Sequence, residues 1–308
     1  MHRCLSFLSH VAAVAALGVA SAVATVARAE VAAPERGVLY LTIRDRTGET
    51  APKDFYGDAR SDLKAGVCEI GQTELRVLTP VAEAAPFRVP DEILRVERLR
   101  ETGSGALLDT LEASTAGRAP LLYTHGFYID FEKGCRRATL LQENARQEGR
   151  FLWFSWPSDG ALLNYTHDEA DLYWSVPDIA RTITRLSDRF GATPVNLAGH
   201  SLGARGMVLA LYELANSRPD VRLGELVLLA PDMDFDIFRK MLPRIRPLVT
   251  AITVYVAEDD RPLALSEEIH GYPRLGQAGN DVATLTGVEV IDVGDLPVMS
   301  ASGHLYHI

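Results

Sequence analysis

Cysteine is scarce in this chain: three residues in 308 are too few for a small scaffold held together by several disulfides. Basic residues are also few, because 31 Lys and Arg stand against 41 Asp and Glu, a formal net charge of −10. Such a balance disfavours binding to a nucleic-acid backbone, which needs clustered positive charge. Apolar residues make up 47% of the chain, which excludes a wholly disordered protein. The composition is that of an ordinary globular protein.

The first 29 residues differ from the rest because they contain no acidic side chain. Arg3 and Arg28 are their only Lys or Arg, and a stretch of mostly Ala, Val and Leu lies between them. A basic start, an apolar stretch and small residues at Ala27 and Ala29 are typical of a cleaved secretory signal. We expect residues 1–29 to be a signal peptide, cleaved after Ala29, and the mature protein to be periplasmic or secreted without a stable membrane span. An uncleaved membrane anchor is the alternative.

Two cysteines, Cys68 and Cys135, remain after this cleavage. An oxidising compartment permits a disulfide between them. Two buried free thiols are the alternative, because separation along the chain says nothing about the distance between the Cα atoms.

Residues 37–117 carry strand-like patterns. Runs at 38–43, 75–78 and 93–99 are rich in apolar and β-branched residues. Turn residues at 46–48, 56–58 and 103–105 separate these runs. We therefore predict that residues 30–118 form a β-rich N-terminal extension.

After Pro120, short apolar runs alternate with helical patterns. Continuous apolar strands that alternate with helices indicate a parallel sheet covered on both faces. The fold prediction is therefore an α/β core over residues 119–308, with a mostly parallel, doubly wound sheet and helices on both faces. The expected strands are 121–124, 151–156, 194–198, 226–230, 252–256 and 288–293, and the expected helices include 131–148, 168–190 with a break near Pro177, and 202–216.

A G-x-S-x-G motif, Gly199-His200-Ser201-Leu202-Gly203, lies between the predicted strand 194–198 and the predicted helix 202–216. This is the context of a nucleophile elbow, a sharp turn that lifts a serine hydroxyl above the carboxyl edge of a sheet. Both glycines are expected because side chains there would collide with the adjoining strand and helix. We predict that Ser201 is a nucleophile.

A serine nucleophile needs a base, and in this architecture the base is a histidine late in the chain. His304 follows a run of small residues, Ser300-Ala301-Ser302-Gly303, which can turn it back over the sheet. His304 is therefore the predicted base. His307, second from the end, is the alternative.

The base needs an acid that orients it, and this acid is expected just after a strand between Ser201 and His304. Asp260 follows the predicted strand 252–256 and is the predicted acid, with Asp259 beside it as an alternative. Asp232 or Asp234, after the preceding strand, could supply the acid in a variant arrangement. The D-x-D-x-D spacing at 232–236 lacks the Gly and the closing Glu of a calcium loop, so we expect no metal there.

The strand at 121–124 ends in His125-Gly126-Phe127. A strand ending in this way places backbone N–H groups beside the elbow. We predict that the N–H groups of Phe127 and Leu202 form an oxyanion hole, and that His125 has a structural role.

The His125-Gly126-Phe127 and Gly199-His200-Ser201-Leu202-Gly203-Ala204 motifs resemble those of the α/β-hydrolase superfamily of esterases and lipases. Three further segments resemble a poorly characterised, exported bacterial branch of it: Phe154-Ser155-Trp156-Pro157-Ser158, Ala230-Pro231-Asp232 and Gly303-His304. The resemblance implies the α/β-hydrolase fold and a triad of Ser201, Asp260 and His304. The chain departs from that pattern at 258–260, where three acids stand in place of one, and at Cys135.

We therefore expect a serine hydrolase that cleaves carboxylic esters through an acyl-enzyme. An acyltransferase with the same triad and a non-catalytic binding protein are the alternatives. No metal or organic cofactor is needed for this chemistry. The expected partner is a small-molecule or lipid ester, with no nucleic acid, and the sequence does not indicate an oligomeric state.

Overall fold

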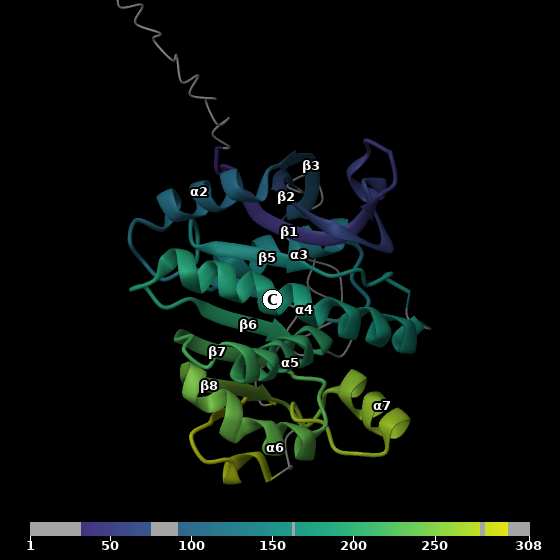
Figure 1. The fold of residues 1–308 in the computed structure, drawn as a ribbon. Coiled ribbons are helices and arrows are strands. Elements are labelled where there is room, and N and C mark those ends of the chain that lie inside the picture. The colour runs from purple at the N-terminus through teal and green to yellow at the C-terminus, as the bar shows by residue number, and fades with distance from the viewer. Residues whose placement is uncertain (1–31, 75–91, 162–163, 278–280, 295–308) are drawn as a thin grey trace, which may run out of the picture.

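The structure is a computed structural model, and it describes residues 32–74, 92–161, 164–277 and 281–294. One sheet of nine strands runs through these residues in the order β3-β2-β1-β5-β4-β6-β7-β8-β9 (Figure 1). Six neighbouring pairs, from β1·β5 to β8·β9, are parallel, and the pairs β1·β2 and β2·β3 are antiparallel. The prediction of a mostly parallel sheet is confirmed.

Strands β4 to β9 lie close to the apolar runs that predicted them. The runs of β4 to β8 are largely apolar rather than alternating because helices or neighbouring elements bury both faces of a parallel strand. Strand β9, at the edge of the sheet, has exposed Glu289 and Asp292. The strands are β4 (Leu121–Thr124), β5 (Phe151–Ser155), β6 (Asn196–His200), β7 (Leu223–Leu229), β8 (Val249–Val256) and β9 (Glu289–Asp292).

The N-terminal strands belong to the same sheet. Strand β1 (Gly37–Arg46) lies parallel to β5 on one side and antiparallel to β2 (Tyr56–Glu74) on the other, and β2 pairs with β3 (Glu92–Thr102). The expected turn at 56–58 is wrong, because these residues begin β2. The expected strand at 75–78 lies outside the described residues.

Helices cover both faces of the sheet. Helices α2 (Ser104–Thr115), α4 (Tyr165–Phe190) and α5 (Leu202–Ser217) pack on one face, and α3 (Phe131–Asn144) packs on the other against β1, β2 and β5 (Figure 1). The remaining helices are α6 (Phe235–Ile245) and α7 (Arg261–His270), with short 3-10 turns at Pro52–Asp54, Arg246–Leu248 and Asp281–Thr284.

Two expectations about helices need correction. Residues 103–105 are not a turn between strands, because α2 begins at Ser104 and interrupts the otherwise β-rich N-terminal section. Helix α4 also continues through Pro177 instead of breaking there. The apolar face of α4 on both sides of the proline, including Leu172 and Ile183, is buried in the core, and this packing outweighs the lost hydrogen bond.

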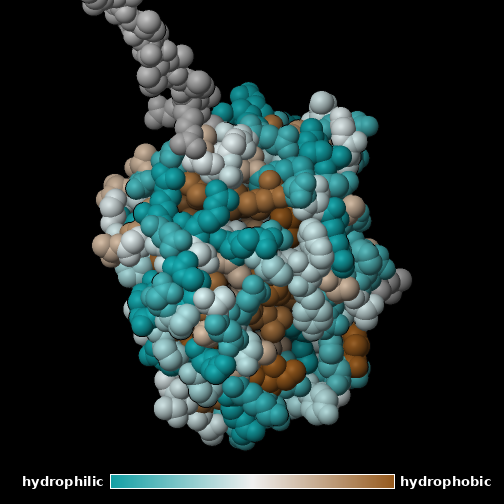
Figure 2. All heavy atoms as spheres, viewed as in Figure 1, coloured by the Kyte–Doolittle hydropathy of each residue, from teal (hydrophilic) through white to brown (hydrophobic). Residues whose placement is uncertain are grey.

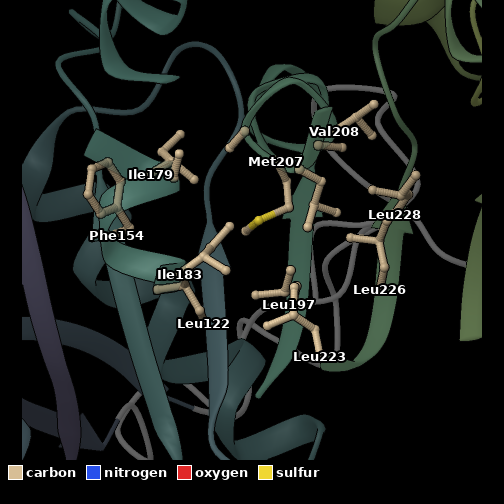
Figure 3. Close-up of a cluster of buried hydrophobic side chains, with 14 of the residues drawn as sticks. Leu122, Phe154, Ile179, Ile183, Leu197, Met207, Val208, Leu223, Leu226 and Leu228 are labelled. Atoms are coloured by element: carbon tan, nitrogen blue, oxygen red, sulfur yellow. The ribbon is translucent and has the colours of Figure 1, made fainter. Parts of the chain in front are cut away.

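The main core lies between the sheet and helices α4 and α5. Figure 3 shows Leu122, Leu197 and Leu226 of the sheet facing Ile183 of α4 and Met207 of α5, and all five side chains are buried. Burying one such side chain stabilises the fold by about 1.5–3 kcal/mol.

The face of the molecule drawn in Figure 2 is largely hydrophilic. Among the described helices, none combines the length and apolarity that crossing a membrane requires.

A disulfide crosses a second, smaller core, which lies between the sheet and α3. Cys68 of β2 bonds to Cys135 of α3, with Cα atoms 6.5 Å apart and a sequence separation of 67. Both sulfurs are buried among apolar residues. Of the two alternatives left open by the sequence, the structure therefore has the disulfide, which fastens α3 to the N-terminal strands.

We expect the Cys68→Ala/Cys135→Ala double variant to lose about 2–4 kcal/mol of unfolding free energy, because a cross-link between distant residues restricts the unfolded chain. Urea denaturation followed by circular dichroism measures this loss. Reductant should lower the midpoint of the wild type and leave that of the double variant unchanged. A double variant as stable as the oxidised wild type would contradict the expectation.

Candidate functional site

Ser201 stands at a sharp turn between β6 and α5. It is the residue before the first residue of α5, and its backbone adopts φ 52° and ψ −121°. A positive φ is uncommon for a residue other than glycine, and it costs free energy that the surroundings must supply. Hydrogen bonds fix the turn, since the Ser201 N–H donates to Leu229 O (2.9 Å) and the Asp232 N–H donates to Ser201 O (3.2 Å). The turn therefore has the geometry of a nucleophile elbow.

The glycines of the motif allow this turn to pack closely. A Cβ on Gly199 would lie 2.6 Å from the Cα of Ala204 in α5, and a Cβ on Gly203 would lie 2.7 Å from the carbonyl oxygen of Thr124 in β4. Either contact is too short for a real Cβ. The first glycine thus makes room for the helix, and the second lets the helix approach the neighbouring strand.

The loop after β4 lies directly against the elbow. A Cβ on Gly126 would stand 2.9 Å from the Cβ of Ser201 and 2.8 Å from Nδ1 of His200. The backbone at Gly126, the residue before Phe127, therefore lies close against Ser201. Leu202 is the first residue of α5, where the N–H groups have no partner within the helix. The two predicted oxyanion-hole residues thus adjoin the serine from different elements.

His125 is buried beside this loop and has structural contacts. Its ring stacks on Trp156 with centroids 5.0 Å apart, its Nδ1 donates to Gly126 O (2.8 Å), and the Trp156 indole N–H donates to His125 O (2.7 Å). Burial, assisted by the positive charge of Arg44, lowers the pKa of His125 to about 3. The ring is therefore neutral at physiological pH.

Asp260 lies beyond the carboxyl end of β8 and is 1% exposed, whereas Glu258 and Asp259 beside it are exposed. Its carboxylate accepts a hydrogen bond from the Leu263 N–H (3.1 Å) as the N-cap of α7. Strand β7 alone separates β8 from β6, so Asp260 and Ser201 share the carboxyl edge of the sheet. Of the three acids at 258–260, Asp260 is the buried one.

Asp232 and Asp234 have other partners. Asp232 is buried, with Oδ1 2.8 Å from Arg274 Nε and 3.2 Å from Arg205 Nη2. Burial alone would raise the pKa of Asp232, but Arg205 and Arg274 outweigh it and hold the pKa below its ordinary value. Asp234 caps α6 by accepting from the Ile237 N–H (2.9 Å).

The Asp232 carboxylate belongs to a polar network that joins three helices and two loops. Tyr165 OH and Ser266 Oγ donate to it at 2.5 and 2.6 Å, and Arg205 also pairs with Glu169. Glu169 in turn lies 3.1 Å from Nε2 of His270. The ring of Tyr165 packs edge-on against Phe127, with centroids 5.2 Å apart. The sequence carries no signal for this network, because its members come from α4, α5, α7 and two loops.

No group in the described residues is a convincing metal site. Asp159, His167 and Asp168 place ligand atoms within 4.8 Å of one another, but the oxygens of Asp168 already accept hydrogen bonds from Ser158 and from the Asp159 N–H. At 232–236, Asp232 pairs with arginines, Asp234 caps a helix and Asp236 pairs with Arg239 (2.8 Å). These three carboxylates therefore do not form a calcium loop.

The structure thus brings Ser201, Leu202, the Phe127 loop and Asp260 to one edge of the sheet. His304 and His307, the two candidate bases, and the signal segment 1–29 lie outside the described residues. The predicted roles of these residues stay predictions.

The sheet, its covering helices and the elbow define an α/β hydrolase. The family model for the alpha/beta hydrolase of unknown function (DUF900) matches residues 105–308, and the chain belongs to this family. A comparison with curated proteins found no match.

We expect Asp232→Asn to lower the unfolding free energy by about 3–5 kcal/mol, because it leaves Arg205 and Arg274 buried with less compensating charge. The lowered pKa of Asp232 means that its contribution is complete above its unfolded pKa and is lost as pH falls through its folded pKa. The difference between wild type and variant should therefore shrink below about pH 4. Urea denaturation between pH 7 and pH 3 measures both effects.

The matched control is Asp236→Asn, because Asp236 forms an exposed pair with Arg239 in the same acidic segment. Its loss should stay below about 1 kcal/mol. Equal losses in the two variants, or a difference for Asp232→Asn that does not change with pH, would contradict the ion-pair interpretation.

Proposed function

We propose that this protein is a serine hydrolase that cleaves carboxylic esters through Ser201, His304 and Asp260. The observation that carries the proposal is the strained backbone of Ser201, buried at the junction of β6 and α5 with Gly126 against it. A serine in a disfavoured conformation needs a reason, and presenting its hydroxyl at the carboxyl edge of an α/β sheet is such a reason. Membership of an α/β-hydrolase family supports it.

In the first half-reaction His304 takes the proton of the Ser201 hydroxyl as the oxygen attacks the ester carbonyl carbon. The carbonyl π electrons move to its oxygen, and this oxyanion accepts hydrogen bonds from the N–H groups of Phe127 and Leu202. Collapse of the tetrahedral intermediate breaks the bond to the alcohol, which leaves with the proton carried by His304. The acyl group is then bonded to Ser201.

In the second half-reaction water replaces the alcohol. His304 accepts a proton from the water as it attacks the acyl carbon. The second tetrahedral intermediate then collapses to the free acid, and His304 returns its proton to the departing Ser201 oxygen. Asp260 holds the imidazole in the correct tautomer and stabilises its charged form in both halves. The burial of Asp260 supports this role, because a carboxylate shielded from water interacts more strongly with an imidazolium.

We place the protein in the periplasm or outside the cell, with residues 1–29 removed as a signal peptide. The disulfide between Cys68 and Cys135 supports this placement, because disulfides persist in oxidising compartments and are rare in the cytosol. The substrate is a small-molecule or lipid ester, and the acidic net charge makes a nucleic-acid partner unsuitable.

Ser201→Ala should reduce p-nitrophenyl ester hydrolysis to the uncatalysed background and abolish labelling by a fluorophosphonate probe, because it removes the attacking oxygen. Initial rates and gel fluorescence measure the two effects. Ser217→Ala is the matched control, since Ser217 is an exposed serine at the other end of α5. Labelling that persists in Ser201→Ala would overturn the assignment of the nucleophile.

Paired variants identify the acid and the base. Asp260→Asn should lower kcat by about 10³–10⁴-fold, because an asparagine leaves the imidazole in the wrong tautomer. Asp259→Asn should stay within about twofold of wild type, because Asp259 is exposed. Likewise His304→Ala should be inactive and His307→Ala active. Loss of activity in Asp259→Asn or His307→Ala, with the partner variant active, would reassign that role.

A further inference from the structure

Arg44 is a fully buried arginine on β1, which precedes the region matched by the family model. In the pairing of β1 with β5, Thr42 lies opposite Ser155, the last residue of β5. Arg44 is two residues further along, so it reaches past the carboxyl end of β5 to the edge that carries Ser201. In the sequence Arg44 directly follows the apolar run 38–43 and precedes Asp45 and Arg46, so it looks like the start of an exposed turn.

The guanidinium of Arg44 binds the backbone of two loops at this edge. Nη2 donates to Ile129 O at 2.7 Å, in the loop after β4, and Nη1 donates to Ser158 O at 2.7 Å, in the loop after β5. Nε donates to Ser155 Oγ at 3.0 Å, and Nη1 also donates to Gly57 O at 3.2 Å. The fork geometry of arginine allows these contacts at once, which a lysine ammonium cannot match.

Ser158 and Asp168 also hold the loop after β4. The Ile129 N–H donates to Ser158 Oγ at 3.0 Å, and Ser158 Oγ donates to the buried carboxylate of Asp168 at 2.5 Å. The Tyr128 N–H lies 3.4 Å from the same carboxylate. Tyr128 adopts φ 63°, so the backbone next to Phe127 is strained and needs such restraints to keep its conformation.

Arg44 and Asp168 are both buried, and burial raises the pKa of the Asp168 carboxyl. Burial lowers the pKa of Arg44 to about 10, and Asp168 is the acid that most favours its charged form. Arg44 is therefore protonated at neutral pH. Burying charges in this way is a weak source of stability, because desolvation offsets the attraction. A conformational role explains the arrangement better than a stabilising one.

We propose that Arg44, Ser158 and Asp168 form a clamp that positions the Phe127 N–H for the oxyanion. Arg44 is a positioning residue: it holds the carbonyl two residues beyond Phe127, while Ser158 and Asp168 hold the amides of Tyr128 and Ile129. The catalytic role of this clamp rests on the proposed function. Its consequence is that the N-terminal strand outside the family match is required for turnover.

Arg44→Lys and Ser158→Ala test the clamp. Each should lower kcat on a p-nitrophenyl ester by about 10–100-fold with KM within twofold of wild type, because a displaced donor weakens binding of the transition state more than binding of the substrate. Arg189→Lys is the matched control for the arginine, since Arg189 pairs with Asp109 and Glu112. Ser114→Ala is the control for the serine, because its hydroxyl bonds to Gly149 O (2.7 Å). Ser114 is bonded beside the start of β5, and Arg189 lies in the last turn of α4. Both controls should keep wild-type kcat, because no contact of theirs reaches the loop after β4 among those described for these two residues.

Hydrogen exchange followed by mass spectrometry supplies a readout that does not need activity. Both clamp variants should exchange the amides of peptides covering 126–131 at least tenfold faster than wild type, with peptides of β6 and α5 unchanged. If Arg44→Lys fails to fold, Ser158→Ala decides by itself, because it removes the acceptor of the Ile129 N–H and leaves Arg44 in place.

The outcomes separate the two proposals. Clamp variants with wild-type kcat and wild-type exchange at 126–131 overturn the clamp while ester hydrolysis by the wild type upholds the proposed function. A wild type that hydrolyses no ester and takes no fluorophosphonate overturns the proposed function, and the exchange experiment then decides whether the loop is clamped. A loss of kcat in the controls equal to that in the clamp variants also overturns the clamp.

Discussion

The parallel pairing of strands β4 to β8 is the constraint on which the candidate site depends. In this register Thr124 lies opposite both Phe154 and Gly199, and His200 lies opposite Leu229. Parallel strands all end at the same edge, so the loops that follow them meet there. The Phe127 loop, the Ser201 elbow and Asp260 come from three such loops, and the backbone hydrogen bonds of the sheet, rather than the loops themselves, bring them together.

Buried charges restrain the loops on both sides of the elbow. On one side Arg205 and Arg274 enclose Asp232, whose N–H also bonds to Ser201 O. On the other side Arg44 donates to Ile129 O, and Asp168 accepts from the N–H of the strained residue Tyr128. In each arrangement charged side chains add hydrogen bonds to loop backbone. Because buried ions add little net stability, their value here lies in selecting one loop conformation.

The elements that differ from prediction are those whose local sequence pattern is weak. Strand β2 contains Gly57, Gly66 and Gly71 and many polar residues, and it forms because β1 and β3 pair with it on both sides. Helix α2 begins beside Gly103 and Gly105, which resemble a turn, but its buried Leu107, Leu108 and Leu111 dock on the sheet. In both cases tertiary contacts override a local preference, which sequence patterns alone do not report.

The sequence by itself determined the parts of this protein that depend on neighbours in the chain. Continuous apolar runs set the parallel strands, and G-x-S-x-G between a strand and a helix set the elbow at Ser201, because both signals act over a few residues. Only the tertiary structure decided that Cys68 meets Cys135, that Asp260 is the buried acid of its cluster, and that Arg44 reaches the loop of Ile129. These outcomes depend on distances between residues far apart in the chain, and such distances are fixed only when the sheet has formed.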